Sequence, residues 1–249
     1  PILKPSSRTF LMASQWKINT YPQKMEYANP YYEAQLNLLI RMSKTRFQEV
    51  NLNSFPRFLD DDLVQFRNLN PSVFVLPDNH DSQAPKERLI KLLEQKEIEW
   101  LGIEMLPEDF QQDLDTFIDE PEGTEKFSRS EARLKEWLHT MWDPAINEQD
   151  VEQGYFAILK AAKRLKKRVI AIDAATDYEV SVEASNFSLR SILLRNSLWA
   201  ERLPQTGHGI IFGGEDHFRG PGEEDGVFNL LPATAFIKQR GFSIFAPQK

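Results

Sequence analysis

Two of the four histidines in this sequence, His80 and His217, each stand a few residues after a short apolar run. Each also follows a pair of carboxylate or amide side chains, in the segments Asp78-Asn79-His80 and Glu215-Asp216-His217. An imidazole titrates near neutral pH and can act as base, acid or metal ligand, and a neighbouring carboxylate can orient the ring and stabilise its charged form. These positions therefore indicate acid–base or metal chemistry, although a histidine such as His80, taken alone, is more often a loop-capping residue.

A carboxylate and a guanidinium elsewhere in the chain could complete such a site. Glu104 interrupts the apolar run 100–106, and it needs a partner because an unpaired carboxylate is costly to bury. Arg195 lies in an apolar helical pattern, where it could be buried with a carboxylate, bind a ligand anion or be solvated. The candidate site residues are therefore His80, Glu104, Arg195 and His217.

Short apolar runs that alternate with helical patterns must position these residues. Buried strands are predicted over 73–76, 100–106, 169–172, 209–212 and 242–245. Helices are predicted over 85–96, 107–118, 129–141, 149–166, 186–203 and 226–239. This alternation predicts an α/β fold in which helices flank a mainly parallel (mixed) central sheet. Ligands of such sheets bind beyond the carboxyl ends of the strands, so the candidate residues are expected to meet there.

The 249 residues show no repeat and no clear linker, so one domain is the simplest organisation. Residues 1–70 lack the strand–helix alternation and contain a helical pattern over 31–47. We therefore expect a helical N-terminal extension over 1–70 and an α/β domain over 71–249. The first residue is not Met, which suggests a processed chain or an excised domain.

The composition excludes several classes of function. A net charge of −7 and a pI near 5.3 make the chain a poor nucleic-acid binder, because phosphate contacts need a basic surface. The absence of cysteine excludes thiol nucleophiles, zinc–thiolate sites and iron–sulfur clusters. Neither Gly-x-Ser-x-Gly nor Gly-x-Gly-x-x-Gly occurs where a serine hydrolase or a dinucleotide-binding enzyme would need it. No apolar run approaches the roughly 20 residues of a membrane span, so we expect a soluble protein, either cytoplasmic or secreted.

The order of these motifs resembles a superfamily that contains erythromycin esterase-like hydrolases, ChaN-like haem-binding lipoproteins and Tiki/TraB-like proteases. Its typical pattern is a strand ending in Gly-Glu-x-His, a helix, and a strand ending in Glu. An Arg-bearing helix and a strand ending in Gly-x-x-His come near the C-terminus. Here the pattern reads Pro77-Asp78-Asn79-His80, Glu104, Arg195 and Gly214-Glu215-Asp216-His217, and the match covers roughly residues 70 to 246. The chain departs from it at Pro77 and Asp78, and at Glu215 and Asp216, which make the pocket more acidic.

The resemblance implies a hydrolase of ester or peptide bonds with a small-molecule or peptide substrate, and two mechanisms remain open. In an esterase-like version a histidine deprotonates water, Glu104 orients it, and Arg195 stabilises the oxyanion. In a Tiki-like version His80, Glu104 and His217 hold a divalent metal, for which Mn, Co or Zn would suit the ligands.

The same resemblance also implies a non-catalytic alternative. The chain could bind haem or another ligand, with Tyr178 as the candidate haem ligand. It could also serve as a domain of a larger bacterial toxin or effector. We favour the hydrolase over this alternative.

Overall fold

The computed structural model describes residues 55–60, 63, 68–69, 71–80, 82–121, 129–142, 154–174, 187–218 and 232–248. For 187–194 it describes the helical backbone alone. The helix predicted over 31–47 and the candidate haem ligand Tyr178 lie outside these residues.

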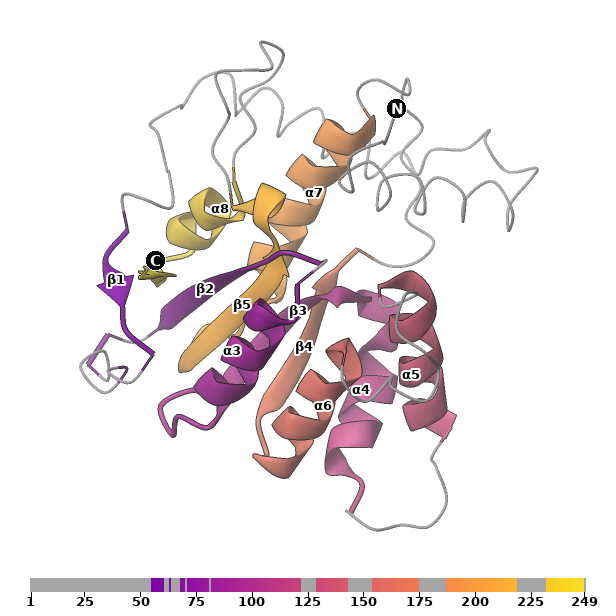
Figure 1. The fold of residues 1–249 in the computed structure, drawn as a ribbon. Coiled ribbons are helices and arrows are strands. Elements are labelled where there is room, and N and C mark those ends of the chain that lie inside the picture. The colour runs from indigo at the N-terminus through magenta and orange to yellow at the C-terminus, as the bar shows by residue number, and fades with distance from the viewer. Residues whose placement is uncertain are drawn as a thin grey trace.

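Six parallel strands form one sheet in the described part of the chain, in the order β1-β6-β2-β5-β3-β4 (Figure 1). The strands are β1 (Arg57–Phe58), β2 (Ser72–Asp78), β3 (Trp100–Pro107), β4 (Arg168–Asp173), β5 (His208–Gly214) and β6 (Ser243–Pro247). The predicted α/β fold is therefore confirmed, and each described strand pair is parallel rather than mixed.

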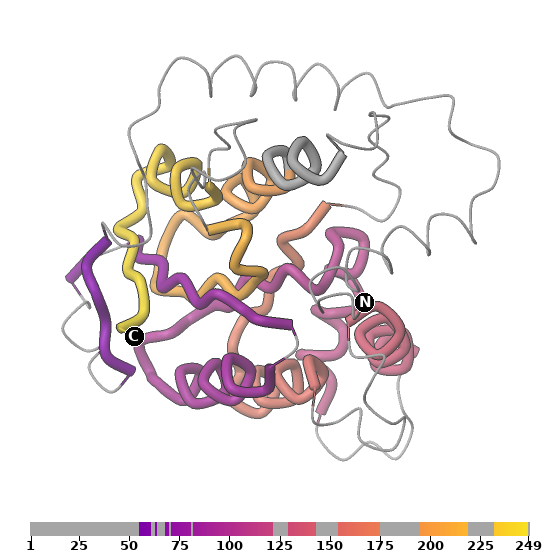
Figure 2. Tube along the Cα trace, turned by 45° about the horizontal axis from the view of Figure 1, so that its top comes forward, coloured from indigo at the N-terminus to yellow at the C-terminus, as the bar shows by residue number. Residues whose placement is uncertain are grey.

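Helices cover both faces of this sheet. They are α3 (Ala84–Leu93), α4 (Gln111–Asp119), α5 (Arg129–Met141), α6 (Tyr155–Arg164), α7 (Phe187–Arg202) and α8 (Ala233–Gln239). Figure 2 shows α7 and α8 on one side of the strands, and α3 and α6 on the other. Because parallel strands are joined by crossovers, this is the layering expected of βαβ units.

Successive side chains of a strand point to opposite faces of the sheet and pack into two separate hydrophobic cores. Phe74 packs with α3 to α6 in the first core, whereas its neighbours Val73 and Val75 pack with α7 and α8 in the second. This alternation follows from the two-residue period of a strand. It also decides on which face of the sheet each polar residue at a strand end is placed.

Several predicted element bounds are wrong. Strand β2 continues through Pro77, where the sequence predicted its end. Proline is tolerated in a strand where its missing N–H is not needed, and β6 pairs with β2 only as far as Phe74. Residue 107 ends β3 instead of opening a helix, so α4 begins four residues later, after a 3₁₀ turn over Glu108–Phe110.

Two residues inside predicted helices are also not helical, and His208 was placed outside its strand. Gly154 precedes the first residue of α6 with a non-helical backbone, and Pro232 does the same for α8. His208, one residue before the strand predicted over 209–212, opens β5 and is buried. Strand β1 lies inside the range 1–70 predicted as a helical extension, yet it pairs with β6 and belongs to the sheet.

Within the described ranges, the outer edge of β4 is covered by a side chain and pairs with no other strand. Gln111 Nε2 donates to Val169 O at 3.0 Å, and Gln111 Oε1 accepts from Ala171 N at 2.8 Å. The amide therefore bonds the edge as a neighbouring backbone would. An open edge strand is a template for pairing with another chain, so this contact protects the sheet.

Replacing Gln111 by alanine is expected to lower the free energy of unfolding by about 1–2 kcal/mol, because two backbone groups lose their partners. The variant should also aggregate more strongly on heating, as measured by light scattering. Gln112→Ala is the matched control, since its exposed side chain lies one residue away on the same helix. Equal stability and equal aggregation of the two variants would contradict this role.

No helix within the described ranges has the length and apolar composition that crossing a lipid bilayer needs.

Candidate functional site

The candidate residues lie at the carboxyl ends of the strands, on both sides of the sheet. Glu104 contacts both Arg195 and His217 on the side of α7. His80 follows β2 and is anchored on the side of α6. The site thus consists of two clusters, which face each other across the end of β5.

The Glu104 cluster consists of Glu104, Asp173, Arg195 and His217. Glu104 Oε1 lies 2.6 Å from Arg195 Nη2 and 3.1 Å from His217 Nε2. Glu104 Oε2 accepts the backbone N–H of Gly214 at 2.5 Å. Glu104 is 3% exposed. A carboxylate buried in an apolar strand needs a partner, and Glu104 has three: Arg195, His217 and the backbone N–H of Gly214.

The charges in this cluster control the ionisation of Glu104. Burial acts to raise the pKa of its carboxyl, but the charges of His217 and Arg195 and the hydrogen bond from His217 outweigh burial. The pKa of Glu104 therefore lies well below its ordinary value of 4.5. Glu104 is therefore ionised at neutral pH and does not act as a proton donor or acceptor.

Arg195 is bound by two carboxylates rather than solvated. Its Nε and Nη2 donate to Asp173 at 2.6 and 2.9 Å, in addition to the bond to Glu104. Burial acts to lower the pKa of the guanidinium, but the charges of Asp173 and Glu104 raise it above its ordinary value. Among the described residues no partner is recorded for Arg195 Nη1, the one nitrogen of the guanidinium not bonded to these carboxylates.

His217 is held rigidly from three sides. Its Nδ1 lies 2.6 Å from Asn196 Oδ1, while Nε2 faces Glu104. Its ring stacks on the indole of Trp199 with centroids 4.1 Å apart and an interplanar angle of 24°. Trp199 Nε1 in turn donates to Asp173 at 3.3 Å. Since both ring nitrogens of His217 already have partners, this ring has no open edge for a substrate.

The His80 cluster consists of Asp78, His80 and Tyr155. His80 Nδ1 lies 2.8 Å from Asp78 Oδ2 and 2.8 Å from the Tyr155 hydroxyl, which itself donates to Asp78 Oδ2. The Nδ1 edge of the ring is thereby fixed. The opposite edge, with Nε2, is directed toward Gly214 and has no recorded hydrogen bond to a described residue.

A buried lysine fixes the backbone beneath His80. Lys86 is 2% exposed, and its Nζ donates to the carbonyl oxygens of His80 at 3.2 Å and Ser82 at 3.3 Å. The same ammonium lies 4.2 Å from the centre of the Tyr155 ring. Lys86 therefore ties α3, the loop after β2 and the first turn of α6 together.

His80 keeps partial access to solvent, with 23% of its side chain exposed. Burial acts to lower the pKa of its imidazole, but the hydrogen bond to Asp78 and the charges of Glu104 and Asp78 outweigh burial and the opposing charge of Lys86. The pKa of His80 is therefore raised above its ordinary value of 6.5. A histidine with one anchored and one open edge is suited to proton transfer.

Gly213 and Gly214 let the two clusters approach each other. A Cβ on Gly213 would lie 2.7 Å from the Trp199 ring and 2.8 Å from Glu104 Oε2. A Cβ on Gly214 would lie 3.0 Å from His80 Nε2 and 3.4 Å from Glu104 Oε2. Both glycines belong to β5, and the absence of side chains there leaves the space that the two clusters occupy.

Gly213→Ala is expected to lower the free energy of unfolding by about 1–3 kcal/mol, because Trp199 and Glu104 are buried and cannot give way. Gly214→Ala should cost less stability, because the partly exposed His80 ring can move aside, yet it should reduce any activity that uses His80. Urea denaturation measures both free energies. A larger stability loss for Gly214→Ala than for Gly213→Ala would contradict this picture.

Asn196, Trp199 and Tyr155 contribute to the site but were not predicted. Asn196 and Trp199 lie one and four positions after Arg195 on α7, so their three-residue spacing could have placed both beside His217. Tyr155 carried no such signal, because it is the first residue of a helix whose start the sequence placed six residues earlier.

The described residues do not form a ready metal site. Both Glu104 oxygens and both His217 nitrogens already have partners. No group of three or more His, Asp or Glu side chains within the described ranges is placed to hold an ion. The predicted ligands His80, Glu104 and His217 thus fit a metal poorly, and no step below is derived through one.

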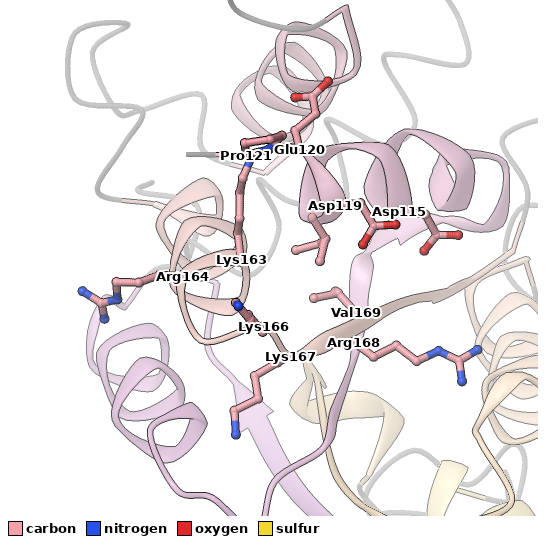
Figure 3. A pocket seen from close by; sticks show the side chains of 11 residues that line it. Asp115, Asp119, Glu120, Pro121, Lys163, Arg164, Lys166, Lys167, Arg168 and Val169 are labelled. Atoms are coloured by element: carbon pink, nitrogen blue, oxygen red, sulfur yellow. The ribbon is translucent and has the colours of Figure 1, made fainter. Parts of the chain in front are cut away.

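A cavity of about 770 Å³ lies at the opposite end of the sheet, beside the start of β4 (Figure 3). Its lining comprises Asp115, Ile118, Asp119, Glu120, Pro121, Lys163, Arg164, Lys166, Lys167, Arg168 and Val169. In Figure 3 Arg164, Lys167 and Arg168 point in different directions, and Lys167 Nζ donates to the carbonyl oxygens of Gln95 and Ile98. These cations do not converge on a common position for an anion.

No protein-family model and no curated protein sequence matches the chain. Among solved structures, the C-terminal region of Pasteurella multocida toxin superposes with a TM-score of 0.57 and 14% identity. The chain is similar in fold to a bacterial toxin region. The match covers 88% of this chain and 30% of the toxin chain, whose structure is described as revealing a thiol-protease-like catalytic triad.

Two further structures show weaker similarity. The type III effector HopBA1 has a TM-score of 0.41 and 15% identity, covering 59% of this chain and 67% of the effector. A structure of bacterial protein toxins has a TM-score of 0.47 and 13% identity, covering 93% of this chain and 44% of the other.

Proposed function

We propose that this chain is a hydrolase of ester or peptide bonds in which His80 is the general base. The observation that supports the proposal best is the orientation of its imidazole. Asp78 and Tyr155 hold the Nδ1 edge, while Nε2 faces the end of β5 with no recorded hydrogen bond to a described residue. A general base has this arrangement when a hydrogen-bond acceptor orients one edge of its ring and the reacting group approaches the other edge.

In the proposed reaction His80 Nε2 takes a proton from water as the water oxygen bonds to the carbonyl carbon of the substrate. The electron pair of the carbonyl bond moves to its oxygen, and an N–H of Arg195 Nη1 donates to this oxyanion and stabilises it. The intermediate collapses when the bond to the leaving group breaks, and His80 returns its proton to that group. Water is the only co-reactant.

The Glu104 cluster serves this reaction as a fixed electrostatic frame. Glu104 and Asp173 orient the guanidinium, and Asn196 and Trp199 orient His217. Donors and charges that are already in place need no reorganisation when charge develops on the substrate. This geometry favours the metal-independent mechanism over the metal-dependent one. A thiol nucleophile has no place in this chain, because the sequence has no cysteine.

The resemblance to erythromycin esterase-like, ChaN-like and Tiki/TraB-like proteins supports the same assignment of His80, Glu104, Arg195 and His217. The toxin-like fold supports a second part of the proposal, that the chain is a module of a bacterial toxin or effector. Production of the chain in eukaryotic cells would test that part, with growth inhibition that His80→Gln relieves as the supporting result.

The hydrolase is tested by measuring hydrolysis of a panel of aryl esters and peptides by the purified chain, before and after treatment with EDTA. Activity that survives EDTA supports the metal-independent mechanism. Activity that EDTA removes and Mn, Co or Zn restores would overturn it in favour of the metal site. No hydrolysis of any ester or peptide, with or without metal, would leave a ligand-binding module.

A further inference from the structure

The hydroxyl of Tyr155 contacts both members of the imidazole–carboxylate pair. It lies 2.8 Å from His80 Nδ1 and donates to Asp78 Oδ2, while that same oxygen lies 2.8 Å from His80 Nδ1. The three polar atoms thus form a closed triangle on one edge of the imidazole ring.

This triangle is held rigidly by its surroundings. Tyr155 and the side chain of Asp78 are both fully buried. The Tyr155 ring packs edge-on against Trp142, with centroids 6.1 Å apart, and lies beneath the ammonium of Lys86. The hydroxyl therefore has no freedom to swing away, and it constrains Asp78 and His80 rather than following them.

The hydrogens of the triangle define the state of the ring. A carboxylate has acceptors only, so Asp78 Oδ2 takes the hydrogens of the Tyr155 hydroxyl and of His80 Nδ1. His80 then carries its hydrogen on Nδ1, and its lone pair lies on Nε2, on the side of Gly214. A ring turned by 180° would lose both contacts.

We propose that Tyr155 is a positioning residue, whose hydroxyl holds Asp78 and the Nδ1 edge of His80 and thereby selects the tautomer in which Nε2 is the free base. The catalytic meaning of this role rests on the proposed function. The state of the ring itself does not, because it can be measured without any substrate.

Removing the hydroxyl changes the charge balance at His80 in a defined direction. Asp78 Oδ1 has no hydrogen-bond partner among the described residues, so without Tyr155 the imidazole would be the remaining donor recorded for this carboxylate. A carboxylate with fewer donors attracts an imidazolium more strongly. The pKa of His80 should therefore rise further in Tyr155→Phe, which keeps the ring and its packing.

The test is a pH titration of the histidine ring signals by NMR in the wild-type chain and in Tyr155→Phe. The sequence has four histidines, and His80→Gln assigns the signal of interest. We expect the midpoint of His80 to move to higher pH and the nitrogen shifts of the neutral ring to show a mixture of tautomers. His139, which lies on α5 outside the cluster, should titrate unchanged. An unaltered midpoint and a single tautomer for His80 would overturn the proposal.

Kinetics then connect this role to catalysis. With a substrate that the wild type cleaves, Tyr155→Phe should lower kcat by about tenfold, leave KM unchanged and move the acidic limb of the pH profile upward. A raised KM with an unmoved profile would contradict a positioning role. If no substrate is hydrolysed, the proposed function fails, while the NMR titration still decides the role of Tyr155.

Discussion

His80→Gln is expected to slow hydrolysis by about 10²- to 10⁴-fold, the range that loss of a positioned general base costs. Glutamine retains much of the size and the hydrogen-bonding capacity of histidine, so Asp78 and Tyr155 keep a polar partner. It cannot take a proton from water at neutral pH. Steady-state rates with the best substrate of the ester and peptide panel measure the loss.

The pH dependence of the wild-type rate should follow the free base form of His80. The pKa of this imidazole is raised from 6.5 by its hydrogen bond to Asp78 and by the charge of Glu104. The rate should therefore increase with pH across a midpoint above 6.5, and that limb should be missing from the residual activity of His80→Gln. A rate that is flat between about pH 5 and pH 8 would show that another group is the base.

The same ionisation has a consequence for stability with the opposite pH trend. Because the folded-state pKa of His80 is raised, its contribution is complete below 6.5 and is lost as pH rises through the folded value. The stability difference between the wild type and His80→Gln should thus shrink toward alkaline pH. His139→Gln on α5 is the matched control. It should alter neither the rate of hydrolysis nor the way in which stability depends on pH.

Glu104→Gln is expected to lower the free energy of unfolding by about 3 kcal/mol. Removing one member of a buried ion pair leaves the other charge without compensation, which typically costs about 3–5 kcal/mol. The lower end applies here because Arg195 keeps its bonds to Asp173. Urea denaturation at pH 7 measures the change. Hydrolysis should also be lost, because the guanidinium and His217 are no longer aligned by a common carboxylate.

The effect of Glu104→Gln should disappear at acidic pH. The folded-state pKa of Glu104 is depressed below its ordinary value of 4.5, chiefly by the charges of His217 and Arg195 acting against burial. Its contribution to stability is therefore present above 4.5 and is lost as pH falls through the folded value. A difference between wild type and variant that grew toward acid would contradict this assignment.

Glu108→Gln provides the control for a carboxylate that pairs with arginine outside the site. Glu108 bonds Arg202, yet 56% of its side chain is exposed. Exposed pairs contribute about 0–1 kcal/mol because water and salt screen them. Stability losses of equal size for Glu104→Gln and Glu108→Gln would mean that the Glu104 cluster is not the buried network described above.

The architecture was predictable because it depends on local patterns. Runs of four to seven apolar residues alternate with helical patterns, and that alternation specifies parallel strands joined by helices. Strand bounds were less predictable: Pro77 continues β2 because β6 pairs with that strand only as far as Phe74. Only the pairing of the strands decided whether the missing N–H mattered.

The sequence by itself determined that His80 and His217 follow strands and that Glu104 lies within one, and parallel strands bring their carboxyl ends to one edge of a sheet. It also determined that Glu104 needs a partner. Only the tertiary structure decided that this partner is Arg195, 91 positions away, and that Tyr155 lies against Asp78 and His80. These contacts depend on the strand order β2-β5-β3-β4 and on which side of each helix faces the sheet. Both are properties of long-range packing, for which a local sequence pattern carries no information.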